Sequence, residues 1–177
     1  MKKARKTPEE TALDLEKVGK LLEQAKGIAR EYRAITGRPL GITSEVAGYE
    51  AARLLQLNLN KARRADYDAT GPDGKKYQIK GRVIYERSKP AKRFGRIRLD
   101  HEWDAVLLVL LDADFSPMEI HEAERPDVEK ALMEPGARAR NARGALNIAR
   151  FKSIARLVWS RETKNISRKD AKSAKDS

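Results

Sequence analysis

The feature that most constrains the fold of this 177-residue chain is one unbroken apolar run, AVLLVLL, at residues 105–111. A strand made only of apolar residues has no face suited to water, so it fits the centre of a sheet that is covered on both faces. A membrane-spanning helix needs about 20 apolar residues, so this run is too short to be one. We therefore predict an α/β fold with a mixed sheet of about four strands flanked by helices.

The remaining elements follow from periodicity and from capping and turn residues. Thr7 and Glu10 form a capping box for the first helix, and Thr43 or Ser44 is predicted to cap the second. Helices are predicted over residues 7–36, 44–56, 126–133 and 145–158, and further strands over 65–70, 75–84 and 118–124. Residues 1–159 are predicted to form one domain, on which helix 7–36 packs, and residues 160–177 a basic disordered tail.

The charge of the chain favours a polyanionic partner. It has 38 Lys and Arg against 26 Asp and Glu, a formal net charge of +12, and nucleic acid is the usual partner of such a protein. An anionic membrane surface is the competing partner. The absence of cysteine excludes disulfides and cysteine-ligated zinc, and the charged N-terminus has no signal-peptide core. We expect a cytoplasmic protein without a membrane segment.

A hairpin over residues 65–83 carries the candidate site. Its turn, Gly71-Pro72-Asp73-Gly74, suits a three-residue loop with a bulge at the glycine. That loop fixes a register in which Asp68 lies opposite Gln78. Because side chains alternate along a strand, Gln78 and Lys80 share the face of Asp68.

These side chains suit phosphodiester chemistry. Carboxylate and amide oxygens from Asp68 and Gln78 are ligands that Mg²⁺ accepts, and Lys80 can stabilise charge on a phosphate. The plainer alternative is a solvated hairpin face.

The order Asp68, nine intervening residues, then Gln78-Ile79-Lys80 resembles the bipartite motif of the PD-(D/E)XK nuclease superfamily. Its Q-x-K ending is similar to the Mrr-type restriction and Holliday-junction-resolvase-like branch, over about residues 40–112. That branch also has a glutamate on the helix before the first strand, for which Glu45 is the candidate and Glu50 the alternative. The resemblance implies a restriction-endonuclease-like core.

As function, the resemblance implies a Mg²⁺- or Mn²⁺-dependent DNA endonuclease. Asp68, Gln78 and Glu45 would hold the metal, and Lys80 would activate water or stabilise the phosphate. A homodimer is an option, since nucleases that cut both strands often dimerise. The sequence departs from the family pattern at Tyr67, where Pro is usual, and at Gln78, where an acid is usual. Gln78 favours an alternative, an inactive nuclease-fold protein that binds DNA or RNA. A third hypothesis is an interaction protein that pairs through its first helix.

The candidate nucleic-acid contacts follow the hairpin in the basic stretch 85–98, beside the proposed site. Tyr85 and Phe94 could stack on bases, and the alternative for the stretch is a solvated loop. The predicted phosphate-contacting residues are Arg82, Arg87, Lys89, Lys92, Arg93, Arg96 and Arg98.

Overall fold

The structure is a computed structural model that describes residues 13–60, 66–85, 94–134 and 146–162. Its helices are α1 (Leu15–Thr36), α2 (Thr43–Leu55), α3 (Arg125–Met133) and α5 (Ile148–Ile154). Its strands are β1 (Asn58–Leu59), β2 (Ala69–Thr70), β3 (Lys76–Val83), β4 (Ala105–Leu111), β5 (Pro117–Glu124) and β6 (Arg156–Ser160). Among these residues, no helix has both the length and the apolar character needed to cross a membrane.

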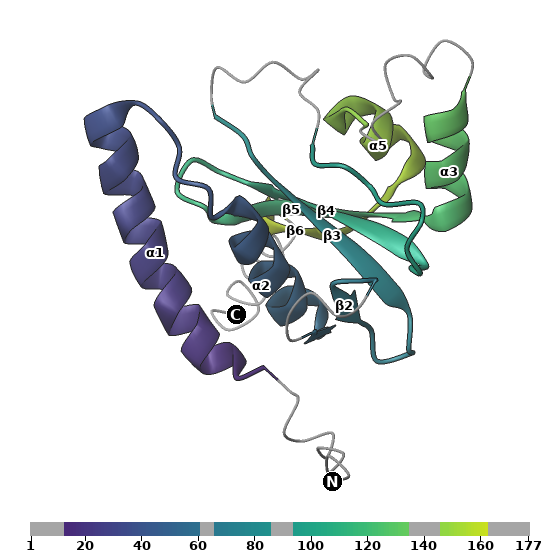
Figure 1. Ribbon diagram of the computed structural model, residues 1–177, viewed down its shortest axis with the longest axis horizontal. Helices are drawn as coiled ribbons and strands as arrows, with labels where there is room; N and C mark the ends of the chain where they lie inside the picture. The colour runs from purple at the N-terminus through teal and green to yellow at the C-terminus, as the bar shows by residue number, and fades with distance from the viewer. Residues whose placement is uncertain (1–12, 61–65, 86–93, 135–145, 163–177) are drawn as a thin grey trace, which may run out of the picture.

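The strands form one mixed sheet in the order β1-β2-β3-β4-β5-β6. Only β3 and β4 pair in parallel; the other neighbours are antiparallel. Helices α1 and α2 lie on one side of the sheet, and α3 and α5 lie on the other (Figure 1). The predicted α/β class with helices on both faces is confirmed, with six strands instead of about four.

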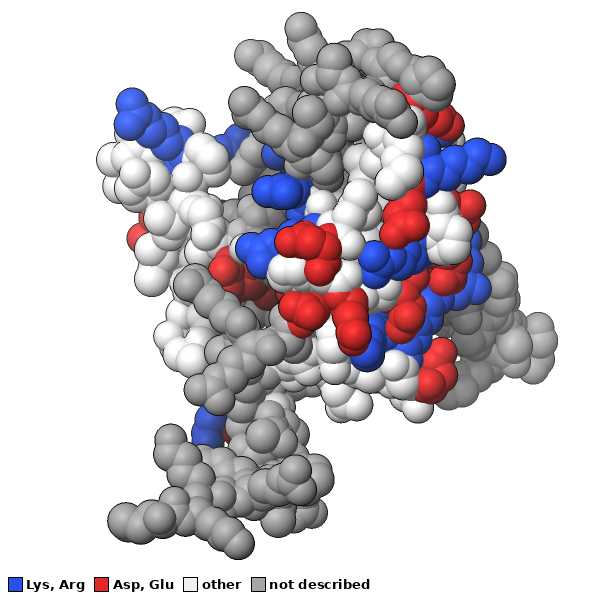
Figure 2. Space-filling view, turned by 45° about the vertical axis from the view of Figure 1, so that its right-hand side comes forward, with Lys and Arg blue, Asp and Glu red and all other residues white. Residues whose placement is uncertain are grey.

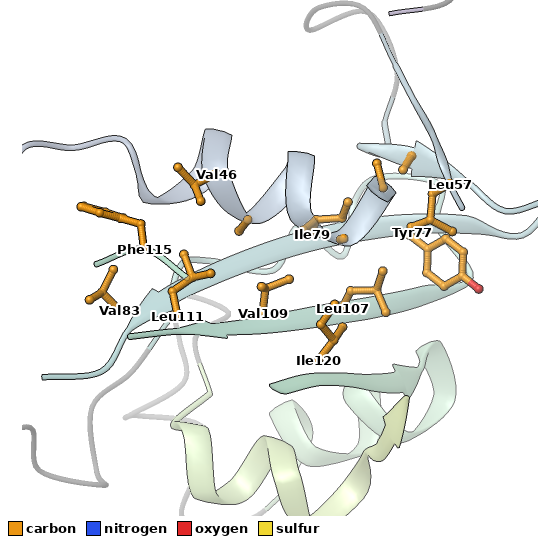
Figure 3. Close-up of a cluster of buried hydrophobic side chains, with 14 of the residues drawn as sticks. Val46, Leu57, Tyr77, Ile79, Val83, Leu107, Val109, Leu111, Phe115 and Ile120 are labelled. Atoms are coloured by element: carbon orange, nitrogen blue, oxygen red, sulfur yellow. The ribbon is translucent and has the colours of Figure 1, made fainter. Parts of the chain in front are cut away.

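Strand β4 is buried along its whole length, as the apolar run predicted. Its residues alternate between two hydrophobic cores, with Leu107 in the core under α2 and Leu108 in the core under α3 and α5. Figure 3 shows the α2 core, in which Val46 faces side chains of β3 and β4 that include Ile79 and Val109. Through the parallel register, Ile79 lies beside Leu107, so the residues on either side of Ile79 face α3 and α5.

Helix α2 lies very close to β3, and Gly81 makes this approach possible. A Cβ at Gly81 would stand 2.5 Å from the Cβ of Ala47 and 2.7 Å from the backbone oxygen of Thr43. These distances are shorter than any normal contact, so only glycine fits under the helix.

A buried ion pair joins α1 to α2. Lys26 donates to Glu50 at 3.2 Å and to Glu23 at 2.8 Å, and Arg53 completes the group by bonding Glu50 at 2.6 Å. Burial, the largest single influence, lowers the pKa of Lys26, but the hydrogen bonds and charges of Glu23 and Glu50 together raise it above its usual value. The pair therefore keeps Lys26 charged between the two helices.

Several predicted boundaries differ from the structure. The end of the predicted helix 145–158 forms β6, because the β-branched and aromatic segment from Arg156 pairs with the edge of β5. The predicted strand 65–70 is ordered as a strand only at Ala69–Thr70. No side chain caps α2, whose N-cap is Ile42. Helix α1 is capped by Asp14, which accepts from the Lys17 N–H, and the predicted Thr7 cap and most of the tail lie outside the described residues.

Candidate functional site

The turn between β2 and β3 sets how the two strands face each other. The Gly71 N–H donates to the Lys75 carbonyl at 2.8 Å. Gly74 has a φ of 84°, in the left-handed region that favours glycine. This is the predicted three-residue loop, and the register that it produces, Ala69 opposite Tyr77, is the predicted one.

Asp68 stands just before β2 and closes the end of the hairpin with its side chain. Its backbone N–H donates to the Tyr77 carbonyl at 2.8 Å, and its Oδ2 accepts from the Ile79 N–H at 2.7 Å. The carboxylate therefore takes the place of a strand carbonyl. Within the described residues its Oδ1 makes no hydrogen bond, and Asp68 is exposed, so this oxygen is available to a ligand.

Gln78 is buried, with 3% of its surface exposed, and both ends of its amide are used. Its Nε2 donates to the Arg98 carbonyl at 2.8 Å, and its Oε1 accepts from the Arg98 N–H at 3.2 Å. The Trp103 indole N–H donates to the same carbonyl at 2.6 Å. Gln78 thus fastens the segment that leads from Phe94 to β4 onto the sheet.

Lys80 lies two residues further along β3, on the same face. A Cβ at Gly95 would stand 4.0 Å from the Lys80 Cδ, so the Gly95 backbone passes beside the lysine stem. Burial lowers the pKa of Lys80, and the nearby Arg98 charge lowers it further, while the Asp68 carboxylate partly opposes this shift. The structure therefore brings Asp68 and Lys80 together, with Arg98 close by.

Four cations on and beside β3 have no ion-pair partner among the described residues: Lys80, Arg82, Arg96 and Arg98, here called the β3 cation cluster. Of the other 15 described Lys and Arg, 11 are paired with carboxylates. Figure 2 shows positive and negative side chains interspersed on the face it displays. Arg96 and Arg98 are exposed, and the buried Nε of Arg82 has no hydrogen-bond partner among the described residues. The cluster is therefore a group of positive charges, on β3 and on the segment bonded to Gln78, with which no described carboxylate forms an ion pair.

The structure does not bring the helix glutamates into contact with these residues. Helix α2 covers the opposite face of the sheet, where Ile79 points. Glu45 is exposed and accepts from the Ser44 hydroxyl at 2.8 Å. Glu50 is buried in the ion pair with Lys26.

The fit of a divalent cation depends on the oxygen atoms left free. In the part of the chain that the structure describes, no group of three or more His, Asp or Glu residues could hold a metal ion. Asp68 offers one free oxygen, and the Gln78 amide is already bonded at both ends. A hard cation usually takes several protein oxygens, so these residues as arranged do not fit one.

Arg87, Lys89, Lys92 and Arg93 lie outside the described residues. The basic stretch nevertheless contains an anchor that the sequence analysis missed. Phe94 and Ile97, together with Trp103 beyond the stretch, are buried in the core under α3 and α5, so the prediction that Phe94 stacks on bases is wrong. The spacing of the apolar residues Phe94 and Ile97 indicated this burial, but the surrounding arginines made the stretch look like a solvated basic loop.

The sequence matches no protein-family model, and a comparison with curated proteins found no significant match.

Proposed function

We propose that this protein binds the phosphate backbone of nucleic acid through the β3 cation cluster, on a restriction-endonuclease-like core. The observation that carries the proposal is the cluster itself, in which Lys80 and three arginines, none with a carboxylate partner among the described residues, lie on β3 and on the segment that Gln78 holds against it. Unpaired, partly exposed Arg and Lys side chains are the groups that contact phosphates.

The distribution of charge along the chain supports the proposal. The described residues contain 19 Lys and Arg against 21 Asp and Glu, a net charge of −2, whereas the whole chain carries +12. The excess therefore lies in the other segments. Two of them, residues 61–65 and 86–93, directly precede Asp66 and Phe94 in the chain. Positive segments attached next to a cation cluster increase the attraction for a polyanion.

The core is proposed from the order of its elements. A helix, three antiparallel strands and then a parallel strand follow one another as α2, β1, β2, β3 and β4. The Asp68 and Gln78-x-Lys80 positions fall on the hairpin of this unit, where the resemblance to PD-(D/E)XK nucleases expects them. Nothing in the cluster supplies a pattern for reading bases, so the proposed binding is independent of sequence.

Fluorescence anisotropy with labelled duplex DNA, single-stranded DNA and RNA tests the binding. Arg96→Gln and Lys80→Met each remove one cation and should lower the slope of log affinity against log salt by about 1. The matched control is Lys130→Met, which removes an exposed lysine of α3 that has no ion-pair partner within the described residues. Equal affinities for all four proteins at every salt concentration would refute the proposal.

Metal-dependent cleavage of DNA is the second candidate function. The free Oδ1 of Asp68 beside the Lys80 ammonium favours it, although a metal would require Gln78 to leave Arg98. Supercoiled, linear, single-stranded and branched DNA, and RNA, would be incubated with Mg²⁺, Mn²⁺ or EDTA. Asp68→Asn removes the negative charge but keeps the local structure, because its amide oxygen can still accept from the Ile79 N–H. Cleavage lost in both Asp68→Asn and Lys80→Met would establish this function, and binding without cleavage under any metal would leave the first proposal alone.

A further inference from the structure

Helix α1 has large apolar side chains that the rest of the protein leaves exposed. Its inner side, which includes Leu22 and Ala29, packs against the core under α2. A second row lies beside this inner side, and its large members remain in solvent: Leu21 is 64% exposed, Ile28 60%, Tyr32 41% and Ile35 85%. Figure 1 shows α1 at the margin of the molecule, next to α2. The row therefore requires an explanation that packing within the protein does not supply.

The row has the spacing of a helix-pairing seam. We call it the α1 seam, and it consists of Val18, Leu21, Ala25, Ile28, Tyr32 and Ile35. Its steps alternate between three and four residues, which repeats every seven residues. A narrow seam with this repeat is the surface that a second helix packs against.

No other segment of this chain can cover the α1 seam. The residues outside the described part contain only two large apolar side chains, Met1 and Ile166; the rest are charged, polar, proline, glycine or alanine. A covering helix must present its own apolar row, which these residues do not offer. A second copy of α1 presents the matching row.

We propose that the protein forms a homodimer in which the α1 seams of two copies pack antiparallel, with the two-fold axis passing between Lys26 and Gly27. This pairing sets Val18 against Ile35 of the second copy, Leu21 against Tyr32, and Ala25 against Ile28. All six layers then consist of apolar or aromatic side chains, and the small Ala25 meets the larger Ile28. A parallel pairing would place Ala25 against Ala25 and leave a gap beside the Tyr32 layer.

The charges along the seam are compatible with this pairing. In the antiparallel register Gln24 comes beside Glu31 of the second copy, and symmetry repeats this contact, so an amide can donate to a carboxylate twice. The helix dipoles also oppose one another, which is favourable.

The size of the seam implies a weak dimer. The four large side chains of each copy would together bury on the order of 500 Å² before the flanking residues are counted. That area is at the low end for specific interfaces, so we expect dissociation in the micromolar range. The inference does not depend on nucleic-acid binding.

Sedimentation velocity from about 1 to 200 μM protein tests the dimer. The expected mass rises from 20.0 kDa towards twice that value. Ile28→Glu, which places a carboxylate in a central layer, should weaken association at least 100-fold while helix content by circular dichroism stays unchanged. The matched control is Leu157→Glu, a similarly exposed leucine on β6 (52%) that should associate as the parent does. A parent protein that stays monomeric at 200 μM, or a Leu157→Glu protein that is weakened equally, overturns the proposal.

Cysteine cross-linking tests the antiparallel direction, because the chain has no cysteine of its own. A mixture of the Val18→Cys and Ile35→Cys proteins should form a disulfide-linked dimer under mild oxidation. Each variant alone should not, because two Val18 positions would be about 26 Å apart along the antiparallel pair. Efficient self-cross-linking of each variant, with no gain in the mixture, would refute the antiparallel arrangement.

Discussion

The substitution Gln78→Glu restores the acid usual in the resembled motif, and the structure predicts that it damages the fold. The Gln78 Nε2 donates to the Arg98 carbonyl at 2.8 Å, and a carboxylate at this position has no proton to donate. A carboxylate oxygen would then face the Arg98 carbonyl oxygen at a buried position, where Gln78 is 3% exposed. The introduced carboxylate could still accept from the Arg98 N–H, so one of the two hydrogen bonds is kept.

The magnitude follows from these two atoms. Losing the donated bond and leaving a charged acceptor unsatisfied should lower the free energy of unfolding by about 3 kcal/mol at pH 7. Burial also raises the pKa of the introduced carboxyl in the folded state above about 4.3, its ordinary value. The folded state then binds more protons than the unfolded state. Stability is therefore highest below this ordinary pKa and falls as pH rises through the folded-state pKa. Once protonated, the introduced carboxyl can donate to the Arg98 carbonyl again.

Urea unfolding between pH 4.5 and 8 measures the effect, with Trp fluorescence as the signal. Trp103 is a suitable reporter because its indole bonds the same Arg98 carbonyl. With an m-value of about 2 kcal/mol/M, the midpoint should fall by about 1.5 M at pH 7 and recover most of this loss at acidic pH. Gln78→Met controls for the loss of the amide without a charge, and its loss should not change with pH. A Gln78→Glu protein with the parent midpoint at every pH would refute the argument.

Three further predictions use the same urea assay. Gly81→Ala should cost about 1–3 kcal/mol because its methyl collides with α2, and an unchanged midpoint would contradict the close approach. Glu50→Ala should cost about 3 kcal/mol by leaving Lys26 buried with one fewer partner, whereas adding Lys26→Met should recover much of the loss. Burial raises the pKa of Glu119, but its hydrogen bonds to His121 and Lys152 outweigh burial and lower it. Lys152→Met should therefore reduce stability above about pH 4.5, and the difference from the parent should shrink as pH falls through the lowered pKa.

The fold was most predictable where local chemistry decided it. The apolar run at 105–111 became a strand buried on both faces, and the Gly71–Gly74 turn gave the correct hairpin register. The sixth strand was missed because the residues from Arg156 alternate too briefly to distinguish a strand from a helix. Pairing with the edge of β5, a contact distant in sequence, decided the outcome. The two-residue strands β1 and β2 likewise exist through their pairing more than through their own propensities.

For the site, the sequence predicted which side chains share a face but not what they bond. Alternation correctly placed Gln78 and Lys80 together, facing away from Ile79. The partner of Gln78, the Arg98 backbone, comes from a segment 20 residues away, and no periodicity reveals it. The position of α2 on the opposite face also depends on how the whole sheet is covered, so the placement of Glu45 required the structure.

The amide of Gln78 connects the architecture to the proposed function. Only a side chain that both donates and accepts can bond the N–H and the carbonyl of Arg98 at once. This double contact holds the Arg98 backbone against β3, close enough for the Arg98 charge to act on Lys80. An acid at position 78 would supply a metal ligand but would release this segment. On this argument, glutamine favours a fixed group of cations over a metal centre, which is the reason to test phosphate binding before cleavage.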